Sequence, residues 1–250
     1  MYCTKVIGYL VTFLIRYYFI LSVCFITSLI LYISYKRRIV IISVDGNIGS
    51  GKSTLIKFLK KKYKNIIVID EPVNQWLNIV DSDNKNILQK FYEGSERYSY
   101  TFQNFAFITR SINLIDQINS LKTKLFIKKV IITERSVETD KHIFAKMLYD
   151  TNQMTQLEYN MYNFWYKKLY PEVKVKNIIY IKTSPDIAYE RIKKRNRVEE
   201  KDITMEYINS VHEYHEKWLN NKKYSICVLD GNIENYKIHE IDIIKYIQKI

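Results

Sequence analysis

Residues 39–54 have the sequence IVIISVDGNIGSGKST, and this stretch decides the fold of the chain. Its first part is apolar and rich in β-branched side chains, which is typical of a strand buried on both faces. The second part matches G-x-x-x-x-G-K-S, and residues 55–60 continue with apolar side chains at helical spacing. A strand, a glycine loop and a helix in this order are the context that a Walker A motif requires. We therefore predict a nucleoside triphosphate site here, against the alternative of a glycine-rich turn that matches by chance.

The loop itself supplies the predicted phosphate ligands. Glycines let the backbone N–H groups of such a loop come close to phosphate oxygens, and a helix beginning near Lys52 adds its positive N-terminal end. We expect Lys52 to reach the outer phosphates and the Ser53 hydroxyl to bind Mg²⁺. The predicted loop residues are Gly46, Asn47, Ile48, Gly49, Ser50, Gly51, Lys52, Ser53 and Thr54.

Basic residues outnumber acidic ones, with 39 lysines and arginines against 26 aspartates and glutamates, a formal net charge of +13. Such an excess can indicate nucleic-acid binding. The lysines are spread along the whole chain, however, so we favour scattered surface charge and predict no nucleic-acid partner. The three cysteines, Cys3, Cys24 and Cys227, show no metal-binding or redox spacing. This favours a reducing compartment for the folded part.

The N-terminal segment is apolar from residue 6 to residue 35, interrupted by Arg16. Residues 17–35 carry no charge and have nearly the length that spans a bilayer. The sequence KRR follows at 36–38, and such cations keep the adjoining flank of a membrane helix in the cytosol.

We therefore predict a membrane anchor in residues 1–38 and a folded cytosolic domain in residues 39–250. A cleaved signal peptide is disfavoured, because no small-residue cleavage site separates the apolar run from the first strand. A soluble cytoplasmic protein is the alternative, if the N-terminal segment is not translated.

Short apolar strands alternate with helical segments along the rest of the chain. The strands are expected at residues 39–45, 65–70, 129–133, 177–181 and 225–229. This alternation predicts an α/β fold, a five-stranded parallel, doubly wound sheet flanked by helices. The longest helix is expected over 95–122, where an apolar stripe is formed by Phe102, Phe105, Ile108, Ile112 and Ile115.

Charged residues follow the predicted strands at the edge where such sheets bind ligands. Glu71, after the second strand, can accept the proton of an attacking hydroxyl, or it is a turn carboxylate before Pro72. Glu134 and Arg135, after the third strand, can hold an Mg²⁺ water and a phosphate, or they form a surface ion pair.

An arginine run lies further along the chain. Its members Arg191, Arg195 and Arg197 are close enough in sequence to converge on a polyphosphate, although a solvated helix face is equally compatible with this pattern.

Five landmarks follow one another from about residue 38 to the C-terminus. They are GNIGSGKST at 46–54, EPV at 71–73 with Trp76, Tyr92 with RYSYTFQ at 97–103, ERSV at 134–137 with Asp140 and Phe144, and Arg191 with RNRVEE at 195–200. Each is modest alone, but in this order and spacing they resemble the deoxycytidine/deoxyguanosine kinase family. The resemblance implies a P-loop kinase that works as a homodimer.

The resemblance also implies a role for each matching residue. Glu71 would accept the proton of a deoxynucleoside 5′-hydroxyl, with Lys52 and Arg135 completing the catalytic set. Glu134 would help Ser53 to hold Mg²⁺. The lid arginines named above would close over the transferred phosphoryl group, and the stretch 230–235, beginning with Asp230, would lie beside the base of ATP.

The implied substrate-binding residues are Trp76, Tyr92, Phe102, Gln103, Arg110, Asp140, Phe144 and Glu200, besides Glu71 and Arg135. Tyr92 and Glu200 would bind the sugar 3′-hydroxyl, Gln103 would pair with the base edge, and the aromatic rings would enclose the base. In the family, the Arg110 and Asp140 pair accompanies bases with an exocyclic amino group or a purine edge. Without the resemblance, Arg110 can instead be a surface arginine on a long helix, and Asp140 can be a helix N-cap.

Three features depart from the family pattern. Glu138 stands where an aromatic residue is usual, Asn196 stands where the lid often has glycine, and the apolar N-terminus has no counterpart. The first two affect the expected substrate preference and lid flexibility, and not the reaction.

The predicted function is ATP- and Mg²⁺-dependent phosphorylation of deoxynucleosides at the 5′-hydroxyl, with purine deoxynucleosides or deoxycytidine favoured over thymidine. One alternative is a nucleoside monophosphate kinase of the thymidylate-kinase type. Another is a catalytically silent, membrane-tethered P-loop protein, which the intact Lys52, Glu71 and Arg135 disfavour.

Overall fold

The computed structural model describes residues 2–36, 39–121, 129–220, 223–233 and 235–250. Two of the predicted flank cations, Arg37 and Arg38, lie outside these residues. So do Lys122, at the expected end of the long helix, and Glu234, in the stretch expected beside the base of ATP.

Five parallel strands form one sheet in the order β2-β3-β1-β4-β5, which confirms the predicted α/β fold. The strands are β1 (Ile39–Gly46), β2 (Ile66–Ile69), β3 (Lys129–Glu134), β4 (Asn177–Lys182) and β5 (Ser225–Asp230). Because β1 lies between β3 and β4, the chain continues to both sides of it, and ligands bind at such a switch point. The loop after β1 lies at this point.

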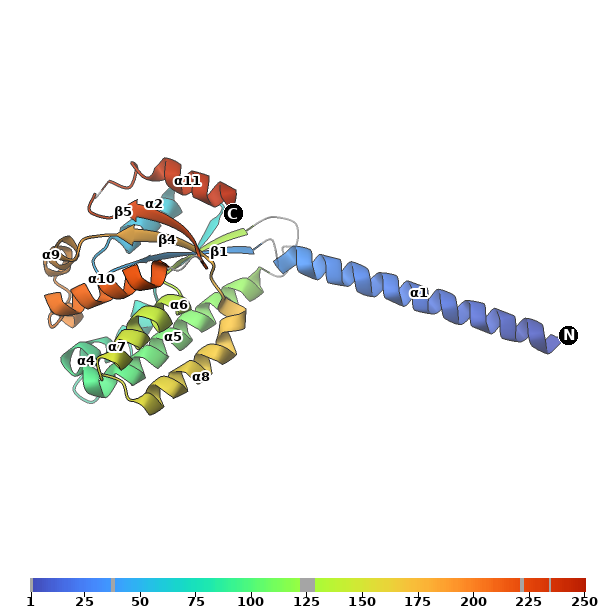
Figure 1. Cartoon of the computed structure of the whole chain (residues 1–250), viewed down its shortest axis with the longest axis horizontal. Helices are drawn as coiled ribbons and strands as arrows, with labels where there is room; N and C mark the ends of the chain where they lie inside the picture. Colours follow the sequence, from blue (N-terminus) through green and yellow to red (C-terminus); the bar gives the residue numbers. More distant parts are fainter. Residues whose placement is uncertain (1, 37–38, 122–128, 221–222, 234) are drawn as a thin grey trace.

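Helices cover both faces of the sheet. They are α2 (Lys52–Lys62), α3 (Val73–Leu77), α4 (Ile87–Glu93), α5 (Ser95–Ser120), α6 (Val137–Thr139), the π-helix η1 (Asp140–Ala145), α7 (Lys146–Asp150), α8 (Gln156–Val173), α9 (Pro185–Arg195), the 3₁₀-helix η2 (Val198–Glu200), α10 (Met205–Leu219) and α11 (Glu240–Lys249). Figure 1 shows α2 and α11 over one face and α5, α8 and α10 over the other.

Neighbouring residues of β4 show how the two layers form. Ile179 packs in the layer of α2 and α11 with Leu55, whereas Ile178 packs on the other face with Val211 of α10. Since successive side chains of a strand point to opposite faces, a central strand must be apolar at nearly every position. This is why the sequence of β4 predicted a buried strand.

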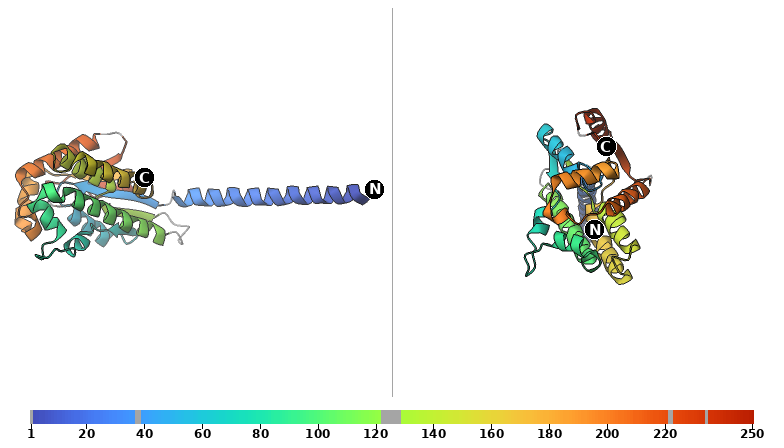
Figure 2. Two further views of the ribbon diagram at one scale, coloured as in Figure 1. Left: turned by 90° about the horizontal axis from the view of Figure 1, so that it is seen from below. Right: turned by 90° about the vertical axis from the view of Figure 1, so that its left-hand side faces the viewer.

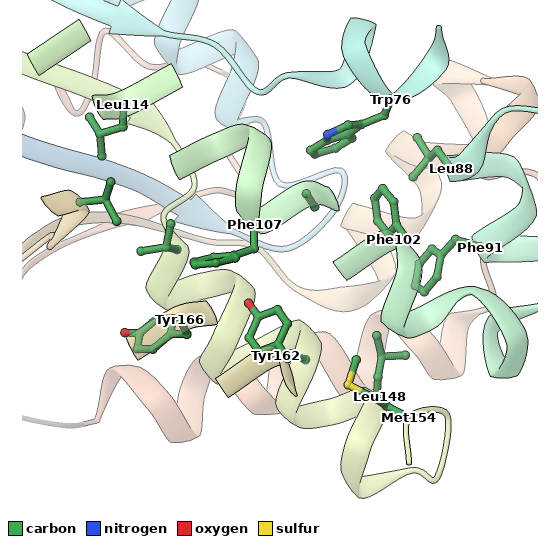
Figure 3. Close-up of a cluster of buried hydrophobic side chains, with 14 of the residues drawn as sticks. Trp76, Leu88, Phe91, Phe102, Phe107, Leu114, Leu148, Met154, Tyr162 and Tyr166 are labelled. Atoms are coloured by element: carbon green, nitrogen blue, oxygen red, sulfur yellow. The ribbon is translucent and has the colours of Figure 1, made fainter. Parts of the chain in front are cut away.

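A further cluster joins α4, α5 and α8 beneath the sheet, with Trp76, Phe91, Phe102, Phe107 and Tyr162 among its members (Figure 3). It extends from the core to the wall of the cavity described below, so packing and ligand binding share side chains there.

Two details differ from the sequence-based expectation. Strand β2, predicted to be buried, lies at the edge of the sheet, and all its residues are half-buried. Apolar composition does not distinguish an edge strand from a central one, so the sequence could not show this. On α5 the predicted stripe is wrong at Ile112, which is 48% exposed. The buried face of α5 instead includes Gln103 and Arg110, polar residues that a search for apolar periodicity passes over.

Helix α1 (Tyr2–Lys36) projects away from the rest of the described chain (Figure 2). Its segment Phe13–Ser34, 22 residues, is long and apolar enough to cross a membrane, and the protein buries none of it. The helix is therefore present as predicted. Length and composition alone qualify it as a span, and a signal sequence would meet the same criteria.

Candidate active site

A cavity of about 490 Å³ opens at the carboxyl ends of β1 and β3. It is lined by the phosphate loop and by side chains from α3, α4, α5, η1, α9, η2 and α10. The predicted site residues that line it are Ile48, Gly49, Gly51, Lys52, Ser53, Thr54, Glu71, Trp76, Tyr92, Phe102, Gln103, Arg110, Glu134, Arg135, Asp140, Phe144, Arg191, Arg195, Arg197 and Glu200.

Four predicted residues do not line the cavity: Gly46, Asn47, Ser50 and Asp230. Gly46 and Asn47 lie next to it, because their carbonyl oxygens accept hydrogen bonds from Lys52 Nζ at 3.2 and 2.7 Å. Asp230 is exposed, and its Oδ1 accepts a hydrogen bond from the backbone N–H of Asn232 at 2.9 Å.

Two glycines shape the phosphate loop. Gly49 has φ +75°, and a Cβ there would lie 2.2 Å from the carbonyl oxygen of Ala188 in α9. Gly51 has φ +94°, and a Cβ there would lie 2.0 Å from the Tyr236 hydroxyl. A positive φ together with no room for a side chain restricts both positions to glycine. The loop can therefore pack directly against α9 and Tyr236 while α2 begins at Lys52.

Lys52 is the buried cation of this loop, with 5% of its surface exposed. Burial and the neighbouring Arg135 lower the pKa of Lys52 to about 7, and Glu134 and Glu71 offset only part of this effect. The ammonium group is thus held in a position that favours an anionic partner.

Glu71 lies between two guanidinium groups. Its Oε1 is 3.0 Å from Arg110 Nη2 and 3.4 Å from Arg135 Nε, while Arg110 Nε is 2.9 Å from Asp140 Oδ2. Burial acts to raise the pKa of Glu71, but Arg135, Arg110 and Lys52 outweigh it and hold this pKa below the ordinary value. Glu71 is therefore an ionised carboxylate at neutral pH.

Arg135 has an uncommon backbone conformation, with φ +62°. Its N–H donates to the carbonyl of Val44 at 3.0 Å, and its Nη1 donates to the carbonyl of Gly46 at 3.0 Å. The guanidinium lies 4.8 Å from the centre of the Phe144 ring. A left-handed non-glycine residue costs of order 1–3 kcal/mol and persists only where its surroundings fix it, often at functional sites.

Ser53 and Glu134 present oxygens to one another, with Ser53 Oγ donating to Glu134 Oε1 at 2.8 Å. Burial and then the nearby charge of Glu71 raise the pKa of Glu134. A cation beside this carboxylate would act in the opposite direction and lower its pKa. The described residues contain no group of three or more His, Cys, Asp or Glu side chains that could hold a metal alone. The hydroxyl and carboxylate oxygens of Ser53 and Glu134 are of the kind that Mg²⁺ prefers, and Mg²⁺ completes its coordination with waters and phosphate oxygens.

Residues 42–250 match the family model described as deoxynucleoside kinase. The chain belongs to the deoxynucleoside kinase family. It is 41% identical over 196 residues to a probable deoxycytidine kinase of Fowlpox virus (strain NVSL), covering 76% of this chain and 77% of the relative.

Two vertebrate relatives support the same assignment. Deoxycytidine kinase 2 of Gallus gallus is 34% identical over 236 residues, which cover 83% of this chain and 88% of the relative. A mitochondrial deoxyguanosine kinase of Xenopus laevis is 34% identical over 195 residues, which cover 72% and 73%. The resemblance inferred from the sequence landmarks is confirmed, and the chain is an enzyme of the deoxynucleoside kinase class.

Aromatic side chains also line the kinase cavity, among them Trp76, Phe91 and Phe102, and Figure 3 shows these three rings packed close together. Trp76 and Phe102 meet edge to face at 5.3 Å, and Trp76 Nε1 donates to Thr109 Oγ1 at 3.0 Å. Phe91 stacks on Phe102 at 4.9 Å and also lines the cavity. Sequence inspection missed Phe91, although its position one residue before Tyr92 on a short amphipathic helix was a usable signal.

Tyr207 is a second residue that was missed. Its ring lies 6.1 Å from that of Tyr92, edge to face, at the cavity wall. Burial, Tyr207 and then Glu200 are the main causes that raise the pKa of Tyr92. Tyr92 and Glu200 both line the kinase cavity.

The π-helix η1 brings Asp140 and Phe144 to the cavity wall together. Just before it, Thr139 donates a hydrogen bond to Asp45 of β1 and caps α6 with Ser136. Short π-helical segments are frequent at functional sites. The sequence of this segment carries no signal for the change of pitch.

The lid arginines of the kinase are held by partners on the protein. Arg195 Nη2 lies 2.6 Å from Glu200 Oε2, and Arg197 Nη1 lies 3.5 Å from Glu200 Oε1. Arg191 Nη1 donates to the carbonyl of Gly231 at 2.7 Å. Asn196 ends α9 with φ +51°, a conformation that asparagine tolerates, which explains how it replaces the glycine expected in the lid.

Proposed function

We propose that this deoxynucleoside kinase transfers the γ-phosphoryl group of ATP to the 5′-hydroxyl of a deoxynucleoside, with Mg²⁺. The observation that carries the proposal is Glu71, an ionised carboxylate held by two arginines at the cavity that the phosphate loop also lines. A proton acceptor beside a polyphosphate site is the arrangement that phosphoryl transfer to a hydroxyl needs.

On the donor side, the loop residues and the start of α2 bind the phosphates, and Lys52 supplies a positive charge near the group that is transferred. Ser53 and Glu134 would hold Mg²⁺, which when bound neutralises charge on the phosphate oxygens. The lid arginines close over the same phosphates. For Arg195 and Arg197 this requires release from Glu200.

On the acceptor side, Glu71 takes the proton of the 5′-hydroxyl and Arg135 steadies the phosphoryl group. Tyr92 and Glu200 bind the sugar 3′-hydroxyl. Gln103, itself 2% exposed, forms hydrogen bonds with the base edge between the rings of Trp76, Phe102 and Phe144.

The base preference follows from Asp140, which Arg110 holds as a hydrogen-bond acceptor at the cavity wall. An acceptor matches a donor on the base, such as the exocyclic amino group that cytosine, adenine and guanine carry. Thymine presents a carbonyl and a methyl group instead. Thymine would leave the buried Asp140 carboxylate without a donor, and this loss costs binding free energy. Thymidine should therefore be the poorest of the four natural substrates.

Measurement of kcat/KM for the four deoxynucleosides tests this proposal, with deoxynucleoside monophosphates offered beside them. Thymidine is expected to trail the best substrate by about tenfold or more. Phosphorylation of monophosphates alone would favour the thymidylate-kinase alternative, and absence of any turnover would favour a catalytically silent protein. A clear lead for thymidine would refute the role given to Asp140.

The proposal extends to the assembly and location of the kinase. We infer a homodimer, and a membrane anchor in residues 17–35 that leaves the domain 39–250 in the cytosol. Without translation of residues 1–38, the same domain would be soluble and cytoplasmic. No nucleic-acid partner is required by any of these steps.

A further inference from the structure

The sheet has a basic edge opposite the cavity. Because all five strands are parallel, their first residues lie along one edge, and the cavity lies at the other. The lysines at this edge are Lys64, two residues before β2, Lys129, the first residue of β3, Lys174 and Lys176, just before β4, and Lys223, two residues before β5. We call these five residues the lysine edge.

Acidic residues are scarce in the sequence beside the lysine edge. All its members except the half-buried Lys129 are exposed. Among the described residues in the three positions before β2, β4 and β5, none is acidic, and Glu172 is the first acid upstream of β4. Lys64, Lys174 and Lys176 form no salt bridge with any carboxylate in the described part of the chain. Such an edge attracts an extended anionic surface.

The position of helix α1 indicates which kind of anionic surface the lysine edge meets. It ends at Lys36, and β1 begins at Ile39 on this same edge of the sheet. Three residue steps reach at most about 11 Å. When α1 crosses a bilayer, the start of β1 therefore lies within about 11 Å of the end of α1. This distance is comparable with the Debye length of roughly 8–10 Å over which charge attraction is felt.

We propose that the lysine edge docks on anionic phospholipid headgroups of the leaflet from which α1 emerges. The proposal rests on the membrane anchor inferred above, and not on the kinase reaction. Near an anionic leaflet each lysine strengthens attachment roughly fivefold, so several together fix the orientation of the domain. Nucleic acid is the other extended polyanion, but α1 favours the membrane because it brings the lipid surface to this edge.

Lysine acylation measures the docking in the full chain. The protein is reconstituted in vesicles of phosphatidylcholine alone, or with about 30% phosphatidylserine, and acylated lysines are counted by mass spectrometry. The lysine edge is expected to react at least fivefold more slowly in the anionic vesicles. Lys193 and Lys194 of α9, at the opposite end of the molecule in Figure 1, should react equally in both. About 0.5 M salt should abolish the protection.

A matched pair of variants isolates the charge. Replacing Lys64, Lys174, Lys176 and Lys223 by Gln should remove the anionic-lipid protection of the remaining Lys129. Replacing Lys193, Lys194, Lys201 and Lys237 by Gln removes equal charge elsewhere and should leave it intact. Both variants should keep full kinase turnover, because none of these lysines lines the cavity.

Each outcome decides between the proposals. Equal acylation in both vesicles, in a chain that resists alkaline carbonate, overturns the docking and keeps the anchor. Extraction of the full chain by alkaline carbonate overturns the anchor, and the docking with it. The kinase function is tested separately by turnover. Protection by added DNA in neutral vesicles, without protection in anionic ones, overturns the docking in favour of nucleic acid.

Discussion

Glu71 owes its charge to its neighbours, since Arg135 and Arg110 outweigh the burial that would otherwise raise its pKa. Its folded pKa lies below the ordinary value, so the basic form persists throughout the neutral range and is lost only at acid pH. We expect Glu71→Gln to fold and to lower kcat about a hundredfold or more, because an amide cannot accept the proton. Turnover and circular dichroism measure both effects. Activity within a few-fold of the parent would show that Glu71 is not the base.

Lys52 gives a pH dependence to ATP binding. With a pKa of about 7 in the free enzyme, Lys52 is mostly neutral at pH 8, whereas phosphate oxygens favour its charged form. Binding at pH 8 should therefore take up a proton, and affinity should fall by at most about tenfold per pH unit above 7. Calorimetry in two buffers of different ionisation enthalpy measures the uptake. Lys52→Gln should bind ATP weakly without it, and a parent enzyme that takes up no proton at pH 8 contradicts the assignment.

Among single residues, the sequence predicted those that follow a strand or form the glycine loop, because the local sequence determines their positions. The contact between Glu71 and Arg110 joins residues 39 positions apart and depends on how α5 packs. Periodicity could not reveal it. Only the resemblance to the family placed Arg110 and Asp140 in the site, and the left-handed backbone of Arg135 had no sequence signal.

Among the elements, the phosphate loop is supported from the segment after β5. The Tyr236 hydroxyl donates to the carbonyl of Gly51 at 3.1 Å and lies 3.4 Å from that of Ser50. Tyr236→Phe removes only this hydroxyl. We expect KM for ATP to rise roughly fivefold, the worth of about 1 kcal/mol, with KM for the deoxynucleoside unchanged. Steady-state kinetics with each substrate varied in turn gives both values.

Tyr246→Phe provides the control for that prediction. Its hydroxyl accepts from the N–H of Ile178 at 3.0 Å and donates to the carbonyl of Ser225, away from the phosphate loop. This change should lower the Tm and leave KM for ATP as it was. An equal rise in KM for ATP in both variants would mean that Tyr236 acts on stability alone.

Elements with strong local patterns were predicted closely, and those shaped by the site were not. Strand β4 follows its apolar run, but the buried face of α5 is partly polar because Gln103 and Arg110 turn to the cavity. The π-helix η1 depends on contacts such as that of Thr139 with Asp45, which lie 94 positions apart. The periodicity of apolar residues in the sequence contains no information on such contacts.

On the scale of the whole molecule, α8 carries an exposed apolar face. Leu157, Met161, Phe164 and Trp165 recur at helical spacing, and Phe164 is 54% exposed. Exposed apolar patches of this kind mark protein contacts, which supports the inferred homodimer. We expect Phe164→Asp combined with Trp165→Asp to give a folded monomer in sedimentation analysis. Ile241→Asp, at a 63% exposed position of α11, should leave the dimer intact. A parent chain that sediments as a monomer would exclude this assembly.

The order of the elements also fixes which way the active site faces. Strand β1 begins three positions after α1 ends, and the phosphate loop leaves its other end after eight residues, roughly 26 Å away. An anchored kinase therefore opens its cavity away from the bilayer, toward cytosolic ATP. Because the family match begins only at residue 42, a chain starting at Lys36 should be soluble and active. The full chain should resist alkaline carbonate extraction from membranes. Full-length protein found freely soluble in cells would rule out the anchor. Native protein that begins near residue 38 would favour a cytoplasmic enzyme translated from a later start.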